Sequence, residues 1–332
     1  MAVTLADVAA AAGLSGSTVS RALSAPDKVN AATRERVERI AREMGYVPNH
    51  SARSLTSGRT DLIGLIVPDI ANPFFPPIIK AVQARGSQQG KTVLIADVDE
   101  RPADEVPRAR LMRKQVDGLI IASPRTPDDA LGELVSLGPV VFVNRAVPGA
   151  ASVVIDEAGG MEQAVEHLAA LGHRSIAYLD GPKRSWSNAR RKAAVREACS
   201  RLGLELVEFG PFEAQVQSGV HAADLVIARA ITGVIAYDDL IALGVMARLT
   251  ERGVRTGADV SLIGVDDSPM SAMAYPTLTS VHVPGDAAGA AAVDTLLAVI
   301  DGRQDEGAEH VVLDSRLVVR SSTAPVRTPG RS

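Results

Sequence analysis

Aromatic residues make up only 3% of the 332 residues, and cysteine occurs once. The core must therefore consist mainly of Ala, Val, Leu and Ile, within a hydrophobic content of 46% that is typical of globular chains. The single cysteine, Cys199, excludes an internal disulfide and favours a reducing compartment. It lies in the helical pattern AVREACSRLGL, which favours a buried small side chain over a nucleophile.

Long hydrophobic runs are also missing. Asp, Pro or Gly interrupts each apolar stretch well before about 20 residues, the length that spans a membrane. Residues 1–30 contain no basic segment followed by an apolar one, so we expect no secretory signal. These absences predict a cytoplasmic chain with no membrane partner.

Patterns typical of several enzyme classes do not occur either. The sequence has no paired Cys/His spacing for a metal, no GxxxxGK[ST] phosphate loop and no GxSxG nucleophile turn, and its 6 histidines are scattered. We therefore expect a protein that is not an enzyme and that uses no cofactor and no metal.

The net charge of −4 is unevenly distributed along the chain. Residues 1–60 contain 8 Lys or Arg against 5 Asp or Glu, so this end carries +3 and the remainder carries −7. A basic end on an acidic body concentrates attraction for phosphates at that end.

Residues 3–23, VTLADVAAAAGLSGSTVSRAL, predict two short helices joined by a tight turn. Thr4 and Asp7 suit a capped start of the first helix, Gly13 suits its end, and Ser15 suits the cap of the second. The second helix then exposes hydroxyls and one guanidinium, which suit phosphates and base edges in a DNA major groove. The residues alone also fit an Ala-rich helical pair that merely begins a globular domain.

A third helix is predicted in NAATRERVERIAREMGY, with Asn30 as its cap and an apolar stripe that includes Val37 and Ala41. Three short helices form a headpiece of the size of known DNA-binding modules. The following linker, VPNHSARSLTSGRT, has Pro48 to stop the third helix and is too short to form a stable helix alone. Without further information it reads as a mobile tether.

From residue 61 onward, apolar runs alternate with helical segments, which predicts parallel α/β sheets. The expected strands are 62–67, 92–96, 118–122, 140–143, 152–155, 175–179, 233–236, 261–265 and 280–283. The clearest helices are 75–89, 159–171 and 188–202. Ligands of such sheets bind outside the carboxyl ends of the strands.

Polar residues follow several of these strands, and this composition suits a polyhydroxylated ligand. Arg145, Arg191 and Asp266 are candidates for a ligand role, which the family resemblance described below favours, and we expect Arg191 and Asp266 on opposite walls of one cleft. Turn formers and helix caps are the alternative, which we prefer for Asp239, Asp267 and Asn188.

Several blocks together resemble the lactose-repressor (LacI/GalR) family of bacterial transcription factors, and they cover nearly the whole chain. They are VTLADVAAAAGLSGSTVSRAL, TRERVERIAREMGYVPN, SARSL, IGLIVPDIANPFF, HLAALGHRSIAYLDGP and SLIGVDD. The resemblance implies an all-α helix-turn-helix headpiece followed by a two-lobed, periplasmic-binding-protein-like α/β body of parallel sheets. The expected boundaries are 1–47 for the headpiece, 48–59 for a hinge, 60–322 for the body and 323–332 for a flexible C-terminal tail.

The resemblance also implies which residues contact DNA. The linker would be a hinge helix that folds on operator DNA, with Leu55 as a wedge between base steps. The headpiece contacts would be Thr4, Ser15, Gly16, Ser17, Thr18, Ser20, Arg21 and Asn30, and the hinge contacts would be Asn49, Ala52, Arg53 and Leu55.

Between the lobes, the resemblance implies a site for a sugar or a related metabolite. Asn144 stands where the family usually has Asp, and Asp238 where Asn is common. Trp186 fits a stacking face or a lobe anchor equally well. The implied ligand residues are Asp69, Asn72, Phe74, Phe75, Asn144, Arg145, Trp186, Arg191, Asp238, Asp266 and His282.

These expectations describe a nucleoid-associated repressor that binds pseudo-palindromic double-stranded operator DNA as a homodimer or tetramer and responds to a small polar effector. The alternative is a solute-binding protein without a DNA role, which the body alone would fit.

Overall fold

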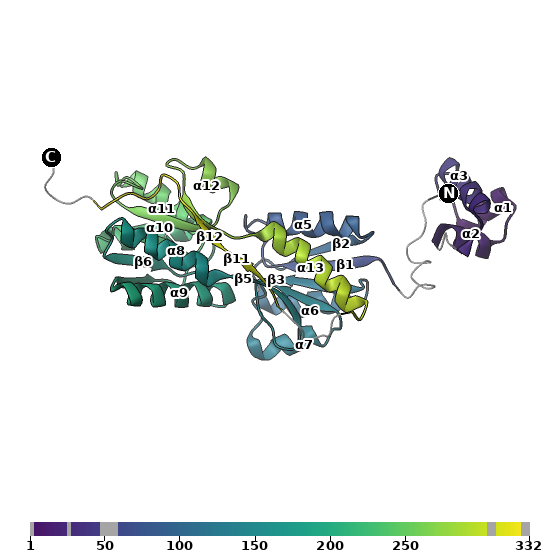
Figure 1. The fold of residues 1–332 in the computed structure, drawn as a ribbon, viewed down its shortest axis with the longest axis horizontal. Coiled ribbons are helices and arrows are strands. Elements are labelled where there is room, and N and C mark those ends of the chain that lie inside the picture. Colours follow the sequence, from purple (N-terminus) through teal and green to yellow (C-terminus); the bar gives the residue numbers. More distant parts are fainter. Residues whose placement is uncertain (1–2, 25–27, 47–58, 304–309, 327–332) are drawn as a thin grey trace. The chain divides into compact units, whose positions relative to one another are not determined.

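The computed structural model describes residues 3–24, 28–46, 59–303 and 310–326. The chain divides into two compact units, Met1–Asp61 and Leu62–Ser332 (Figure 1). Within the described ranges, no helix has the length and apolarity needed to cross a membrane.

The first unit contains α1 (Leu5–Ala12), α2 (Gly16–Ser24) and α3 (Ala31–Glu43). The predicted caps are confirmed. Thr4 and Asp7 form a capping box at α1, and Gly13 ends that helix with φ 61°. Ser15 Oγ accepts the Thr18 amide at 3.2 Å, and Asn30 Oδ1 accepts the Ala32 amide at 2.9 Å. A small apolar core holds the three helices together, formed by Val8, Ala9, Ala12, Val19, Ala22, Val37 and Ala41.

The first lobe of the second unit is a parallel sheet with the strand order β11-β5-β4-β3-β1-β2. Its strands are β1 (Leu62–Val67), β2 (Thr92–Asp97), β3 (Gly118–Ala122), β4 (Val140–Val143), β5 (Ala151–Asp156) and β11 (Val311–Asp314). Helices α5 (Phe75–Gln88) and α13 (Gly285–Ile300) cover one face, while α6 (Pro102–Arg113) and α7 (Leu131–Val135) cover the other (Figure 1). Apolar strands that are covered on both faces form the core, as expected.

The second lobe has the strand order β12-β10-β9-β8-β6-β7. Its strands are β6 (Ser175–Leu179), β7 (Glu205–Phe209), β8 (Gly233–Ala236), β9 (Ser261–Asp266), β10 (Thr279–His282) and β12 (Arg316–Val318). Its helices are α8 (Glu157–Ala170), α9 (Trp186–Leu202), α10 (Val216–Ala228), α11 (Asp239–Glu251) and α12 (Pro269–Met273). One detail departs from an all-parallel sheet, because β12 runs antiparallel to β10.

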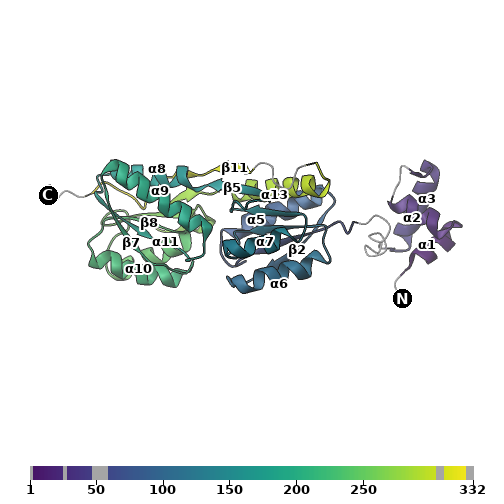
Figure 2. The same cartoon turned by 90° about the horizontal axis from the view of Figure 1, so that it is seen from below.

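The chain passes between the lobes three times. It leaves the first lobe from β5 into α8, returns from β10 into α13, and crosses again from β11 to β12. Figure 2 shows the paired strands β5 and β11 lying side by side at the junction.

Strands β7, β11 and β12 are not among the predicted apolar runs. Each lies at or next to the edge of its sheet, and its residues are only partly buried. An edge strand buries less of its surface, so its sequence lacks the continuous apolar run on which the prediction depends.

Helices α10 and α11 pack unusually closely because each has a glycine at the contact. A Cβ on Gly244 would lie 1.9 Å from the Val216 carbonyl oxygen, and one on Gly219 would lie 2.0 Å from the Ile241 carbonyl oxygen. Only the hydrogen atoms of glycine fit in that space, so the two glycines are what allows the helices to approach this closely.

Candidate functional site

The start of α2 presents a cluster of hydroxyl groups on the surface of the first unit. Ser15 Oγ lies 2.9 Å from Ser17 Oγ and 2.8 Å from Thr18 Oγ1. One turn further on, the exposed Arg21 donates from Nε to the Ser17 carbonyl at 3.2 Å, which holds the base of its side chain against the helix. No atom lies within 4 Å of a Cβ on Gly16, so this position offers open space next to the hydroxyls.

Two further residues that are predicted to contact DNA also cap the N-termini of helices. Thr4 donates from N and from Oγ1 to Asp7 Oδ2, at 2.8 and 2.7 Å. These hydrogen bonds lower the pKa of Asp7. Asn30 uses Oδ1 to cap α3. Both side chains remain exposed, so capping does not remove them from the surface. Asn49, Ala52, Arg53 and Leu55 lie outside the described residues.

The second unit contains a cavity between its two lobes. The first lobe contributes residues that follow β1, β3 and β4, and the second contributes α9 and residues at the ends of β8 and β9. The lining residues are Asn72, Phe74, Phe75, Ser123, Arg125, Asn144, Ser187, Arg191, Tyr237, Asp238 and Asp266. The structure thus brings most of the predicted ligand residues together at the carboxyl ends of the strands.

Four predicted residues do not line this cavity. Asp69 Oδ1 accepts the Ala71 amide at 2.8 Å and so forms a turn. Trp186 begins α9 beneath Arg190, whose guanidinium carbon lies 5.5 Å from the ring centroid. His282 Nδ1 lies 3.1 Å from Asp267 Oδ2.

The fourth, Arg145, is directed into a neighbouring loop. Its Nη1 donates to the carbonyls of Pro124 and Thr126, each at 2.8 Å, and its Nη2 donates to Asp128 at 2.6 Å. The preceding residue, Asn144, adopts φ 57° and faces the cavity instead. This left-handed turn places the two neighbours on different sides of the chain, which the sequence alone does not reveal.

Arg191 is buried on the second-lobe side of the cavity. Its Nε donates to Glu157 Oε2 at 2.6 Å, its Nη2 donates to Glu157 Oε1 at 3.2 Å, and its Nη1 donates to the Tyr237 carbonyl at 2.7 Å. Burial opposes the positive charge, but Glu157, Tyr237 and Asp266 together outweigh it and raise the pKa of Arg191 above its ordinary value. The guanidinium is therefore charged and fixed in place.

The expectation that Arg191 and Asp266 form opposite walls is wrong. Both belong to the second lobe, and Arg191 Nη2 lies 3.8 Å from Asp266 Oδ1. Arg191 also has a full carboxylate partner in Glu157, which the sequence did not suggest because the two residues lie 34 positions apart.

Asp238 caps α11 with one carboxylate oxygen and leaves the other free. Its Oδ1 accepts the Ile241 amide at 2.8 Å, while its buried Oδ2 has no partner among the described residues. Burial, reinforced by the nearby Asp239, raises the pKa of Asp238 to about 7. Burial also raises the pKa of Asp266 well above its ordinary value, although Arg191 opposes this shift.

The opposite wall carries a second guanidinium, that of Arg125, which was not predicted. Its Nε and Nη2 donate to Glu100 at 2.7 and 2.8 Å, and its Nη1 donates to the Ser123 carbonyl at 3.0 Å. The amide of Asn144 donates to Ser123 Oγ at 3.3 Å. Ser123, Ser187 and Tyr237 are the other lining residues that the sequence did not identify. The residues around Arg125, SPRTPDD, predict a turn, so they give no local sign of a functional role for Arg125. Its pairing with Glu100, which is distant in the sequence, is what indicates that role.

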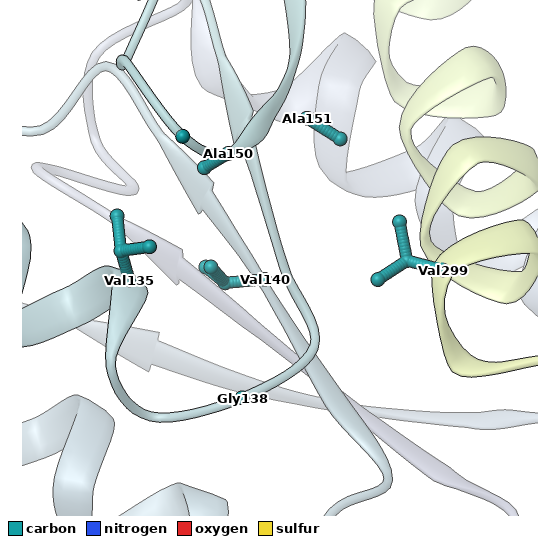
Figure 3. A pocket seen from close by; sticks show the side chains of 7 residues that line it. Val135, Gly138, Val140, Ala150, Ala151 and Val299 are labelled. Atoms are coloured by element: carbon teal, nitrogen blue, oxygen red, sulfur yellow. The ribbon is translucent and has the colours of Figure 1, made fainter. Parts of the chain in front are cut away.

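A second concavity on the first lobe has a different character. Val135, Val140, Ala150, Ala151 and Val299 line it, together with two glycines (Figure 3). These side chains are apolar and offer nothing to orient a polar ligand. Among the described residues, no group of three His, Cys, Asp or Glu could hold a metal ion.

Comparison with known proteins agrees with this architecture. Residues 4–49 match the model of the bacterial regulatory proteins of the lacI family, and residues 165–323 match a periplasmic binding protein-like domain. The transcriptional regulator DegA of Bacillus subtilis is 32% identical over 99% of this chain and 100% of its own.

Two solved structures are similar over nearly the whole chain. The lac repressor dimer bound to operator and the anti-inducer ONPF has a TM-score of 0.86 at 30% identity, covering 98% of this chain and 100% of its own. A complex of the transcriptional regulator CelR with cellobiose has a TM-score of 0.72 at 33% identity, covering 96% and 99%. A helical headpiece, two α/β lobes and relatives matched along their full length lead to one conclusion: the chain belongs to the lacI family of bacterial regulatory proteins.

Proposed function

We propose that this transcriptional regulator represses its target genes by binding operator DNA and that a small polar molecule in the cavity controls its affinity for the operator. The observation that carries this proposal is the cavity itself, where both lobes present buried polar side chains to one small space. A ligand that contacts both lobes stabilises one relative arrangement of them, and such differential affinity is what shifts a two-state equilibrium.

The headpiece reads the operator in this proposal. Residues 1–47 form the DNA-binding part, 48–59 the hinge, and 60–322 the effector-binding and dimerisation body, followed by a tail over 323–332. The exposed α2 hydroxyls and Arg21 enter the major groove. A two-fold dimer presents two such helices, so the operator is pseudo-palindromic. The lac repressor structure supports this arrangement, since it contains a dimer on its operator. A tetramer would bridge two operators.

Regulation of transcription also places the protein in the cytoplasm, at the nucleoid, and assigns it no catalytic role.

The test combines a thermal-shift screen of sugars and nucleosides with a gel-shift titration on the promoter region upstream of its own gene. We expect one compound to raise the melting temperature saturably and to change operator affinity. A compound that binds the body without altering DNA affinity would contradict the proposed control.

A further inference from the structure

The cavity contains more acidic groups than its basic groups can neutralise. Arg125 and Arg191 are the cationic side chains among its described lining residues, and each already has a bidentate carboxylate partner, Glu100 and Glu157. Asp238 and Asp266 line the same space in addition to these two pairs. With all of these groups ionised, the cavity has an excess of two negative charges.

Neither of the two extra carboxylates has a complete set of partners. Asp238 is 1% exposed, and its Oδ2 accepts no hydrogen bond from the part of the chain that the structure describes. Within residues 3–24, 28–46, 59–303 and 310–326, the side chain of Asp266 has one ion-pair contact, of 3.8 Å with Arg191, whose Nε and Nη2 both donate to Glu157. A buried carboxylate without a partner is costly, so this arrangement favours protonated carboxyls or a cation bound beside them.

The other groups that line the cavity indicate which chemical class of cation would fit it. Asn144, Ser123 and Ser187 offer amide and hydroxyl groups, which suit the hydroxyls of a ligand. Phe74 and Phe75 meet edge to face with ring centroids 5.0 Å apart and add an aromatic surface.

From these observations we propose that the effector is a small polyhydroxylated amine whose ammonium group binds between Asp238 and Asp266. The inference rests on the proposed function and specifies the chemical class of its ligand. An ammonium donates three hydrogen bonds, and its positive charge favours the ionised form of both carboxyl groups. Its hydroxyls reach the amide and serine groups of the first lobe.

A pair of achiral probes tests the charge without knowledge of the sugar stereochemistry. Tris carries an ammonium and three hydroxymethyl groups on one carbon, while pentaerythritol carries a fourth hydroxymethyl group in place of the ammonium. Thermal shift and calorimetry with the full chain, in phosphate buffer at neutral pH, compare the two. We expect saturable binding of Tris that is at least tenfold tighter than that of pentaerythritol, equivalent to about 1.4 kcal/mol.

Variants then locate the effect. In Asp238→Asn the amide keeps the helix cap, because Asn caps as well as Asp, and the preference for Tris should fall to threefold or less. Asp266→Asn should behave in the same way. Asp286→Asn removes the same charge from an exposed position outside the cavity and should keep the full preference.

The outcomes separate this proposal from the proposed function. Equal responses to the two probes, including no response to either, would overturn the cationic class, as would a preference that survives in Asp238→Asn or is reproduced by sodium chloride at equal ionic strength. A neutral sugar that binds tightly and alters operator affinity would leave the proposed function intact while refuting this inference. Failure to bind any DNA specifically would refute the proposed function itself.

Discussion

Arg191 and Glu157 form a buried bidentate ion pair, with Nε–Oε2 at 2.6 Å and Nη2–Oε1 at 3.2 Å. Glu157 is the first residue of α8, directly after the chain crosses from β5 into the second lobe. The pair therefore joins the cavity wall to the crossover. A ligand that contacts Arg191 acts on a group that is already connected to the junction between the lobes.

Removing one partner of this pair should destabilise the body strongly. Arg191→Ala leaves Glu157 buried without its cation, which typically costs about 3–5 kcal/mol. Urea denaturation followed by circular dichroism measures the loss. The double variant Arg191→Met, Glu157→Gln should recover most of it, since no uncompensated charge remains. If the single variant were as stable as the parent, Arg191 would not be the counter-ion of Glu157.

The buried Asp238 should make stability depend on pH. Its pKa of about 7 in the folded state is above the ordinary value of 3.8, so the folded state binds more protons between these limits. Its favourable contribution is fully present below about pH 4 and is lost as the pH rises through 7. Over that range the free energy of unfolding should fall by about 1.4 kcal/mol per pH unit. Asp238→Asn should remove the part of this slope that Asp238 contributes and leave the part that comes from Asp266, whereas an unchanged profile would show that Asp238 is already ionised.

Arg21 should contribute to operator discrimination. Arg21→Ala should cost about 1–3 kcal/mol of operator affinity if the guanidinium contacts a base edge, with a smaller loss on random DNA. Gel-shift titrations on both DNAs measure the difference. Arg39→Ala is the matched control, because Arg39 is exposed on α3 and pairs with Glu43 at 3.1 Å. Equal losses on both DNAs would make Arg21 a phosphate contact.

Leu55 should bend the operator, as the resemblance to the family implies. An apolar wedge unstacks a base step and bends the duplex, which lets more of the protein contact it. Leu55→Ala should reduce bending and operator affinity together and leave effector binding intact. Circular-permutation gel shifts measure the bend. If the variant bends DNA as much as the parent does, Leu55 does not act as a wedge.

The close packing of α10 against α11 should tolerate no side chain. Gly244→Ala places a Cβ 1.9 Å from the Val216 carbonyl oxygen, so the helices must separate. Overpacking of this kind typically costs about 1–3 kcal/mol. Gly132→Ala is the control, because a Cβ there meets no atom within 4 Å. Denaturation midpoints of the two variants should differ accordingly, and similar midpoints would mean that the helices adjust freely.

The sequence predicted those features that depend on short-range patterns. The caps at Thr4 and Asn30 and the buried strands follow from local residue types, and they are confirmed. The orientation of Arg145 depends on the left-handed turn at Asn144; Asn tolerates this conformation better than most residues, but the local pattern does not show that this Asn adopts it. Arg125 was missed because its role depends on Glu100, 25 positions away, which only the folded chain brings into contact.

The three crossings divide the chain into segments of unequal length, each of which belongs to one lobe. Residues 157–283 form one uninterrupted segment that carries all of the second-lobe wall of the cavity, including Arg191, Asp238 and Asp266. The first-lobe wall belongs entirely to residues before 157. Recombination between relatives at two positions, near residues 157 and 283, could therefore exchange all of the second-lobe ligand contacts at once. The headpiece, and with it the operator preference, would stay unchanged.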